Sequence, residues 1–394
     1  MGAPSVRRRK VLYVGGYDPG AAAAFYRRFL RQLEIFKSTW SVESSSSELS
    51  ISGQSLSWSV KTTAHDWSVQ TDLELLSWDD LIANEAAGST LTRFGRSAAV
   101  YANLIASGTL SRYFRANPRY FAFSVAPLFQ LAALVILSVI AGFAVGAMSP
   151  TSFALVAGMA AGFVSFIVLQ KWLGNRWRLH QALDDWIMSL DYIHGRREDL
   201  KARISQFAGL ISRAVGQNSV DEILVVGHSL GAILAADALS QALDDVDGEI
   251  SFATLGATIP KCTLHPEAQW LRERVAAVAR RPTVHWVEVQ ARSDPISFFR
   301  FHPVSLEKVV DDDLSTKANP VIRRARLKDM LHESTYRKIR WRPLRLHYQC
   351  VSANERKAMY DFFMMVCGPV PVALWSKKED GFRSLDTDLP MAVG

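Results

Sequence analysis

The chain has 394 residues, 49% of them hydrophobic, which allows one large core, or a core plus a part that sits in lipid, without a second compact domain. The formal net charge of +7 comes from basic residues scattered among acids, so we expect no nucleic-acid partner, and an anionic membrane surface fits the charge equally well. Three cysteines have neither the even count of a secreted disulfide framework nor the spacing of a zinc site, so we expect free thiols in a reducing compartment: Cys262, Cys350 and Cys367.

The N-terminal part predicts a strand, a glycine turn and a helix. The basic run Arg7 to Lys10 precedes an apolar run too short for the core of a signal peptide, so no export signal is expected. The serine-rich residues 41–50 are typical of an exposed loop. The other elements expected before residue 120 are a strand over 11–16, a helix over 21–36, strands over 57–62 and 71–77, and a helix starting at Asp79 and Asp80.

The middle of the chain predicts two membrane spans. From Phe121 to Gln170 there is no Asp, Glu, Lys, Arg or His. Because about 20 residues of helix, at about 1.5 Å each, cross a bilayer core of roughly 30 Å, this stretch holds two crossings. Pro127 suits the first turn of a helix, which predicts spans near 127–148 and 153–170 with a turn over 148–152.

The residues around the two spans predict their orientation. Arginines precede the first span and basic residues follow the second, while the turn is uncharged, so the positive-inside rule places both termini and the rest of the chain in the cytoplasm. Aromatic rings at the same boundary and small residues at spacings of four support a packed helical pair. The alternative is a buried helical hairpin in a soluble core. The residues concerned are Arg112, Arg115, Arg119, Lys171, Arg176 and Arg178; Tyr113, Tyr120, Trp172 and Trp177; and Gly142, Gly146, Gly158 and Gly162.

After the spans, strands alternate with helices, which predicts an α/β fold with a mostly parallel sheet and covering helices. Residues 371–394 are polar and aperiodic, and we expect them to form a poorly ordered tail. The elements expected are helices over 178–215, strands over 222–226, 250–255 and 285–290, a helix over 266–279, and a helix-like run over 353–366.

A short glycine-rich motif carries the strongest chemical signal. Gly227-His228-Ser229-Leu230-Gly231 lies between the predicted strand ending at Val226 and a helical run that begins at Ala232. A nucleophilic serine needs such a sharp turn to lift its hydroxyl clear of the sheet, and glycine at both flanks avoids backbone clashes. The alternative is a glycine-rich turn with an inert serine.

This motif resembles the nucleophile elbow of lipases and esterases in the α/β-hydrolase superfamily. The resemblance implies a hydrolase domain in two parts, 1–120 and 173–370, interrupted by the hairpin over 121–172. It implies Ser229 as nucleophile and the backbone N–H of Leu230 in an oxyanion hole. Gly16 or Tyr17, after the first strand, would supply a second N–H, although this turn is also readable as a plain strand–helix connection.

The resemblance also implies the chain order Ser, acid, His. Asp294, four residues after the strand over 285–290, is the predicted acid, and an ordinary Asp-Pro turn is its alternative. His347 is the predicted base, with His302 and His332 as alternatives. Asp311, Asp312 and Asp313 are interpreted as a solvated charge run, and His228 as structural because the elbow directs it away from Ser229.

Together these residues predict a membrane-anchored serine esterase that uses Ser229, His347 and Asp294, with no metal or cofactor. Because the spans would hold the domain at the cytoplasmic face of the bilayer, a lipid acyl ester is a candidate substrate. The alternative function is a hydrolase-fold membrane protein that binds a partner without turnover. The basic stretch over 323–345 is a candidate for contact with anionic headgroups, an acidic partner or nucleic acid, and a plain solvated surface is the alternative.

Overall fold

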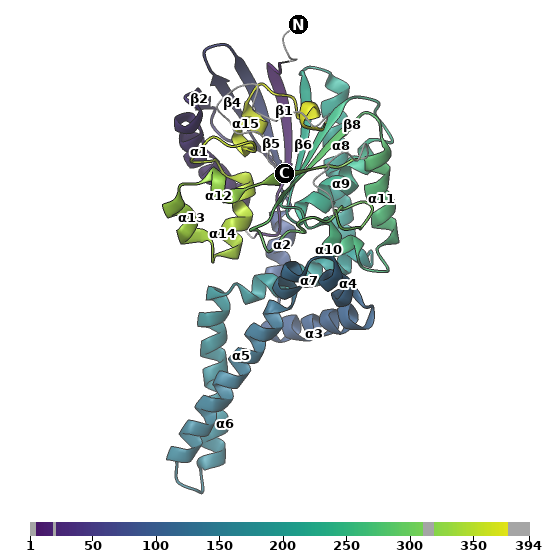
Figure 1. Ribbon diagram of the computed structural model, residues 1–394. Helices are drawn as coiled ribbons and strands as arrows, with labels where there is room; N and C mark the ends of the chain where they lie inside the picture. The colour runs from purple at the N-terminus through teal and green to yellow at the C-terminus, as the bar shows by residue number, and fades with distance from the viewer. Residues whose placement is uncertain (1–4, 19–20, 310–318, 377–394) are drawn as a thin grey trace.

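The computed structural model describes residues 5–18, 21–309 and 319–376, and its centre is one mixed sheet (Figure 1). The strand order is β2-β4-β5-β1-β6-β7-β8-β9, and β3 pairs with β4. Strands from β5 to β9 in this order are parallel, whereas β2, β3 and β4 are antiparallel. The strands are β1 Arg8–Val14, β2 Glu43–Ser46, β3 Ser50–Ser52, β4 Ser55–Thr63, β5 Ser68–Leu76, β6 Glu222–His228, β7 Ile250–Leu255, β8 Val284–Ala291 and β9 Val321–Ala325.

Helices cover both faces of the sheet, which explains why the central strands are buried along their whole length. Every residue of β6 and β7 is buried. On one face Leu224 and Val226 pack with α1 Ala21–Trp40 and α15 Phe362–Cys367. On the other face Val225 packs with α8 Glu198–Gln217, α9 Gly231–Ala242 and α11 Gln269–Arg280. The α/β class with a mostly parallel sheet is thus confirmed.

A third group of helices lies below the sheet in Figure 1 and connects it to the hairpin. It includes α3, α4 and α7, whose buried side chains form a separate apolar cluster with the start of α5 and with Phe298. The remaining helices are α2 Asp79–Ala86, α3 Thr90–Ala106, α4 Thr109–Ala116, α5 Pro118–Met148, α6 Ala154–Leu169, the π-helix Gln170–Gly174, α7 Leu179–Ile193, α10 Ile259–Thr263, α12 Leu327–Met330, α13 Glu333–Ile339, α14 Pro343–Tyr348, the 3-10 helix Gln349–Val351 and α16 Val372–Ser376.

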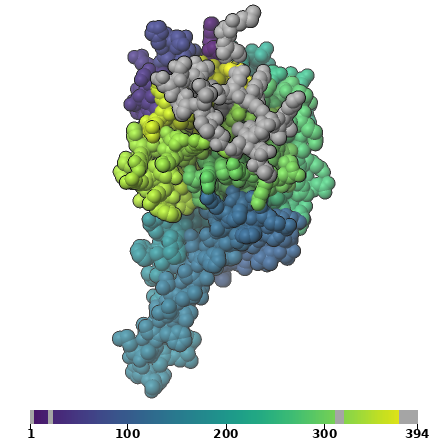
Figure 2. All heavy atoms as spheres, viewed as in Figure 1, coloured from purple at the N-terminus to yellow at the C-terminus, as the bar shows by residue number. Residues whose placement is uncertain are grey.

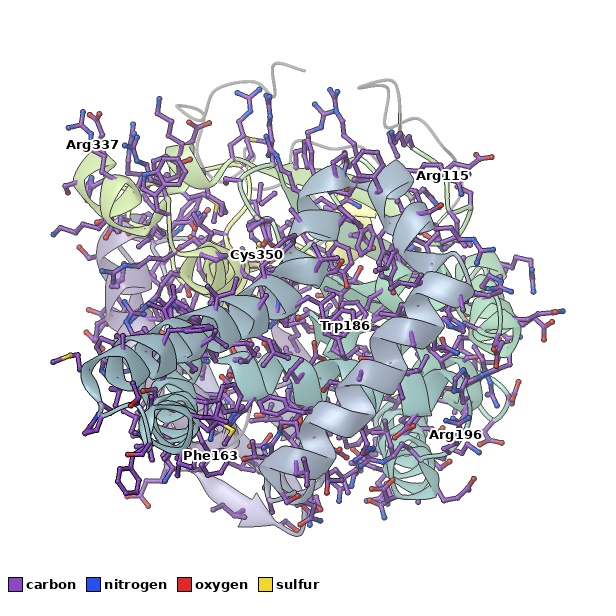
Figure 3. All side chains as sticks on the ribbon, turned by 90° about the horizontal axis from the view of Figure 1, so that it is seen from below. Arg115, Phe163, Trp186, Arg196, Arg337 and Cys350 are labelled. Carbon is purple, nitrogen blue, oxygen red and sulfur yellow. The ribbon has the colours of Figure 1, made fainter. Side chains whose placement is uncertain are left out.

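Helices α5 and α6 form a hairpin that projects from the rest of the molecule as a separate arm (Figure 2). The helix α5, and α6 together with the π-helix that continues it to Gly174, are long and apolar enough to cross a membrane. Their glycines pack face to face: a Cβ added at Gly142 would lie 2.7 Å from the carbonyl oxygen of Gly158. Large apolar side chains such as Phe129, Phe143 and Phe163 are exposed, and Figure 3 shows Phe163 at the outside of the hairpin. The alternative of a hairpin buried in a soluble core is therefore wrong.

The first apolar helix begins earlier than the sequence predicted. We expected Pro127 in its first turn, but α5 starts at Pro118, and Pro127 lies inside it. The reason is the cap: the Asn117 side chain accepts hydrogen bonds from the backbone N–H groups of Arg119 (3.0 Å) and Tyr120 (3.2 Å). Pro118 takes the first helical position, where a missing N–H costs nothing.

Three further expectations were wrong. The serine-rich residues 41–50 contribute β2 and the start of β3, because their backbone pairs with β4 although their side chains show no apolar alternation. The run over 353–366 is helical only from Phe362, where Asp361 caps α15. The tail expected over 371–394 instead begins with α16, because buried Arg9 binds the carbonyls of Val366, Gly368 and Val370 and holds the preceding segment on the sheet; the rest of the expected tail, 377–394, lies outside the described residues.

Candidate active site

Ser229 lies at a sharp turn between β6 and α9. It has a positive φ of 56°, a conformation that costs energy in any residue with a Cβ. The flanking glycines are required by close backbone contacts. A Cβ at Gly227 would lie 2.5 Å from the Cα of Ala232, and one at Gly231 would lie 2.3 Å from the carbonyl oxygen of Gly15. The turn therefore has the geometry that the motif predicted.

Asp294 and His347 form a buried pair, although they are far apart in sequence. His347 Nδ1 lies 2.8 Å from Asp294 Oδ2, and both side chains are almost fully buried. The other carboxylate oxygen of Asp294 accepts the backbone N–H of Ile296 at 2.9 Å. A carboxylate can only accept a hydrogen bond, so this contact favours the tautomer of the neutral ring that has its proton on Nδ1 and its electron pair on Nε2. This is the tautomer that a general base needs.

His347 and Ser229 line the same pocket. His347 Nε2 is buried and has no hydrogen-bond partner among the described residues. The pair with Asp294 packs against the end of β7, where Gly256 has a φ of 53° and a Cβ would lie 3.3 Å from the His347 ring. The structure thus brings the three predicted residues to one place, with an unoccupied acceptor on the imidazole.

His228 packs against the imidazole of His347. The two ring centroids are 4.8 Å apart. Burial holds the pKa of His228 well below its usual value, and the neighbouring His347 lowers it further, so the ring is neutral at physiological pH. A neutral ring in this place supports His347 sterically without adding a charge beside it.

The loop after β1 lies directly against the serine. A Cβ at Gly16 would lie 2.8 Å from the Cβ of Ser229 and 3.3 Å from its Oγ. The loop is fixed at both sides: Trp78 Nε1 donates to the Gly15 carbonyl at 3.0 Å, and the Tyr348 hydroxyl donates to Asp18 at 2.6 Å. Gly16, Tyr17 and Leu230 all line the pocket with Ser229, as an oxyanion hole would require.

The alternative acids and bases lie elsewhere. The Nδ1 atom of His302 accepts the backbone N–H groups of Val304 (3.3 Å) and Ser305 (3.2 Å) and so caps a turn. His332 is exposed at the start of α13. Neither histidine lines the pocket. The charge run Asp311 to Asp313 lies outside the described residues.

The pocket contains residues that the sequence did not assign to a functional site. It has a volume of about 230 Å³ and is lined in part by the first turns of α5, including Tyr120, Phe123 and Pro127. Asp185 on α7 and Lys261 on α10 also line it and form an ion pair of 2.6 Å. No local pattern marks these residues, because three separate elements bring them together.

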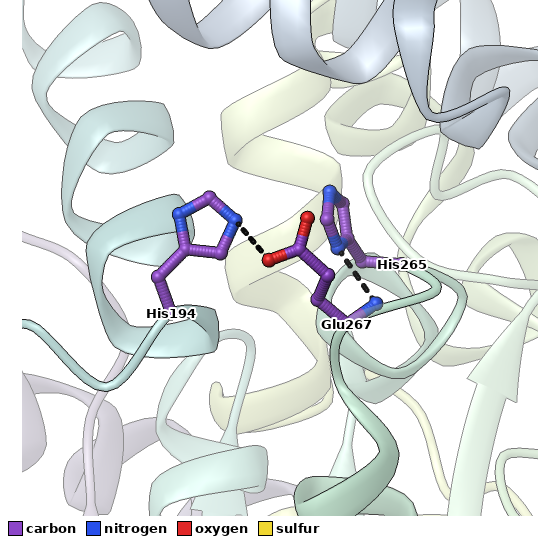
Figure 4. Close-up of side chains that lie close together, drawn as sticks. All are labelled: His194, His265 and Glu267. Atoms are coloured by element: carbon purple, nitrogen blue, oxygen red, sulfur yellow. Dashed lines mark hydrogen bonds and ion pairs between the residues drawn. The ribbon is translucent and has the colours of Figure 1, made fainter.

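A second cluster of polar side chains lies outside this pocket (Figure 4). His194, His265 and Glu267 have residue types that bind cations, and their ligand atoms lie within 4.8 Å of one another. His265 is hydrogen-bonded at both ring nitrogens: Nδ1 accepts the backbone N–H of Glu267 at 3.2 Å, and Nε2 contacts Asn103 Oδ1, outside the cluster, at 2.8 Å. His194 Nε2 lies 3.2 Å from Glu267 Oε2, and 61% of the Glu267 side chain is exposed, so we interpret the group as an ion pair at the edge of the surface.

Comparisons with known proteins add no further constraint. No protein-family model matches the chain, and the searches of curated proteins and of solved structures find no match to it. A function for this chain is therefore inferred from the geometry of the pocket.

Proposed function

We propose that the protein is a membrane-anchored serine hydrolase of the α/β-hydrolase type that cleaves acyl esters. One observation carries the proposal: His347, which lines the same pocket as Ser229, is bonded through Nδ1 to the carboxylate of Asp294. The Nε2 atoms of His347 and His228 are both buried without a partner among the described residues, and the bond to the carboxylate is what marks His347 as the general base. The chain order Ser229, Asp294, His347 is that of the superfamily.

The proposed reaction uses only these residues, the ester and water. His347 Nε2 takes the proton of the Ser229 hydroxyl as Oγ forms a bond to the acyl carbon. Backbone N–H groups of Leu230 and of Gly16 or Tyr17 bind the developing oxyanion. His347 then gives its proton to the leaving alkoxide as the carbon–oxygen bond breaks. In the second half a water molecule, deprotonated by His347, attacks the acyl-enzyme and restores Ser229.

The hairpin gives the proposed enzyme its location. Since α5 and α6 are antiparallel, the first residues of α5 and the last residues of α6 lie at the same end of the hairpin, next to the rest of the molecule (Figure 1). The basic residues at these ends support a cytoplasmic position for the sheet domain. The active site would then face the inner surface of the membrane.

The proposal is tested with a fluorescent fluorophosphonate, which labels only an activated serine. We expect the full chain in detergent to be labelled at Ser229, and Ser229→Ala to abolish labelling. Ser205→Ala, which changes a serine on α8, is the matched control and should label like the wild type. If folded wild-type protein is not labelled, the enzyme assignment fails and a non-catalytic binding protein takes its place.

A further inference from the structure

The pocket extends from Ser229 to the surface of the first apolar helix. Its lining includes Ala126, Pro127 and Gln130 of α5. Between Pro127 and Gln130, Phe129 is 71% exposed and is the first exposed large apolar side chain of this helix. From Phe129 to Met148 the helix has about 20 residues, or roughly 30 Å, the thickness of a bilayer core. The outer end of the pocket therefore coincides with the edge of the lipid-facing surface.

The wall of the pocket also carries several buried polar atoms without partners. Such atoms are rare in folded proteins, since each one forfeits its hydrogen bonds with water. Six atoms that are buried without a partner among the described residues belong to residues that line this pocket: Tyr17 Oη, Gln130 Oε1, Asp185 Oδ1, His228 Nε2, Thr258 Oγ1 and His347 Nε2. Concentration of unsatisfied atoms at one place indicates a site that is completed by a polar ligand.

Several of these residues lie close to the nucleophile along the backbone. The backbone N–H of Thr258 donates to the Ser229 carbonyl at 3.2 Å, and Tyr17 follows Gly16, which touches Ser229. Asp185 is held close by its ion pair with Lys261, whose backbone N–H bonds to the carbonyl of Thr258 at 2.9 Å. The hydroxyls of Tyr17 and Thr258 and the free oxygen of Asp185 thus form a polar subsite beside the reacting centre.

The chemistry of this subsite selects its ligand. A carboxylate oxygen accepts but cannot donate, so a ligand that satisfies Asp185 must bring hydrogen-bond donors. Two cations belong to the pocket wall: Lys261 is already paired with Asp185, and Arg178 is exposed and donates to Gln181 Oε1 at 3.2 Å. A phosphodiester has no donor and repels the carboxylate, whereas free hydroxyl groups both donate and accept. An uncharged hydroxylated group is therefore the best fit.

We propose that the substrate is a bilayer-resident acyl ester with free hydroxyl groups on its alcohol part, which Tyr17, Thr258 and Asp185 bind while the acyl chain lies along α5. This inference rests on the proposed function. In the reaction described above, the hydroxylated alcohol is the leaving group that takes the proton from His347, and water releases the acyl chain from Ser229.

The other side of the pocket supports a contact with the membrane surface. Pro343 and Leu344 line the pocket, and the neighbouring Trp341 is 81% exposed with the guanidinium of Arg340 over its ring at 5.4 Å. Helices α13 and α14, which flank this segment, lie on the side of the sheet from which the hairpin projects (Figure 1). Indole and guanidinium groups prefer the headgroup layer, so this segment would border the path of a lipid into the pocket.

The test compares two esters with the same acyl chain in phosphatidylcholine vesicles: 1-oleoylglycerol, with two free hydroxyls, and methyl oleate, with none. We expect kcat/KM of the wild type to be at least about tenfold higher for 1-oleoylglycerol. Thr258→Val and Tyr17→Phe each remove one hydroxyl and should lower this ratio about fivefold. Tyr26→Phe, whose hydroxyl bonds to the Ser47 carbonyl outside the pocket, is the matched control and should keep the wild-type ratio.

Access from the bilayer is tested at α5. Ala126→Trp fills the pocket, so we expect turnover of vesicle-embedded 1-oleoylglycerol to fall at least about tenfold relative to turnover of soluble 4-nitrophenyl acetate. Ala132→Trp, an exposed position on the same helix that does not line the pocket, should behave like the wild type.

The outcomes separate the inference from the proposed function. If Ser229 is labelled by fluorophosphonate but the two esters are cleaved alike, or the hydroxyl variants keep the wild-type ratio, the substrate assignment is overturned and the serine hydrolase stands. If Ala126→Trp affects both substrates alike, access from the bilayer is overturned. Absence of labelling at Ser229 overturns the hydrolase and this inference together.

Discussion

Arg119, in the first turn of the first apolar helix, donates a hydrogen bond of 2.6 Å to the backbone carbonyl of Arg292, two residues before Asp294. Beside it, Asn117 contacts the carbonyl of Ser297 at 3.4 Å, and the rings of Tyr120 and Phe298 lie 4.0 Å apart. The base of the hairpin thus holds the loop that carries the proposed catalytic acid. The apolar hairpin and the candidate active site are therefore in direct contact.

This contact predicts that Arg119→Ala lowers esterase activity about threefold to tenfold, because a charge-assisted hydrogen bond that fixes the Asp294 loop is lost. Arg115→Ala is the matched control: Arg115 is an exposed arginine one turn earlier that bonds only to Ser111. Its position at the rim of the hairpin-side face is visible in Figure 3. Equal activity of the two variants in the same detergent would show that the hairpin does not position the loop.

Asp294→Asn tests the role of the carboxylate. The amide keeps the shape of the side chain but no longer favours the proton on Nδ1 of His347, so the free electron pair on Nε2 is lost. We expect kcat to fall roughly 10³- to 10⁴-fold with little change in thermal stability. His332→Ala, at an exposed histidine outside the pocket, serves as control. A loss of less than about tenfold for Asp294→Asn would identify Asp294 as a turn residue.

Gly16→Ala tests how closely the first loop approaches the nucleophile. The added methyl would lie 2.8 Å from Ser229 Cβ, so the serine or the loop must shift by several tenths of an ångström. Misplacement on this scale predicts a loss of about 100-fold in kcat/KM in a protein that still folds. At Gly15 the nearest atom to an added Cβ is Tyr13 Cε1 at 3.7 Å, which is an ordinary van der Waals contact. Gly15→Ala should therefore leave kcat/KM close to the wild-type value. Similar activities for the two variants would refute the close approach.

The sequence was most informative where a signal is local. The strand expected over residues 250–255 coincides with β7, and those expected over 222–226 and 285–290 lie within β6 and β8, because buried parallel strands are continuous apolar runs between polar residues. Strands β2 and β3 were missed because their pairing with β4 is a non-local backbone interaction that leaves no apolar alternation. The start of α5 was misplaced because two prolines, Pro118 and Pro127, compete for the same role.

The candidate site likewise has parts that a local signal predicts and parts that only non-local contacts create. The turn at Ser229 could be predicted because its glycines and its neighbouring elements are contiguous. Asp294 and His347, 53 residues apart, were selected through the chain order that the resemblance implies, and the structure places them in contact. The polar subsite could not be predicted, since Asp185 and Thr258 come from separate segments and no sequence motif surrounds either residue. The contribution of α5 to the pocket was hidden by the uniform apolar composition of the helix.

Glu288, in the middle of β8, gives the fold a specific pH dependence. The side chain is fully buried and accepts hydrogen bonds from Gln290 Nε2 at 2.6 Å and Thr254 Oγ1 at 3.2 Å. Burial raises its pKa from 4.5 to about 8, and the two hydrogen bonds offset this only in part. The folded protein therefore retains a proton at neutral pH that the unfolded chain releases.

The higher pKa of Glu288 in the folded state makes the fold less stable as the pH rises. A carboxyl group whose pKa is higher in the folded state stabilises the fold fully below its unfolded pKa, and this contribution is lost as the pH rises towards about 8. Glu288→Gln carries no charge in either state, so we expect it to be more stable than the wild type by about 2 to 4 kcal/mol at pH 8.5 and to show little gain at pH 5. Thermal unfolding at both pH values measures this, with the exposed Glu48→Gln as control. An equal gain at pH 5 and pH 8.5 would mean that packing, and not the proton held by Glu288, sets the difference.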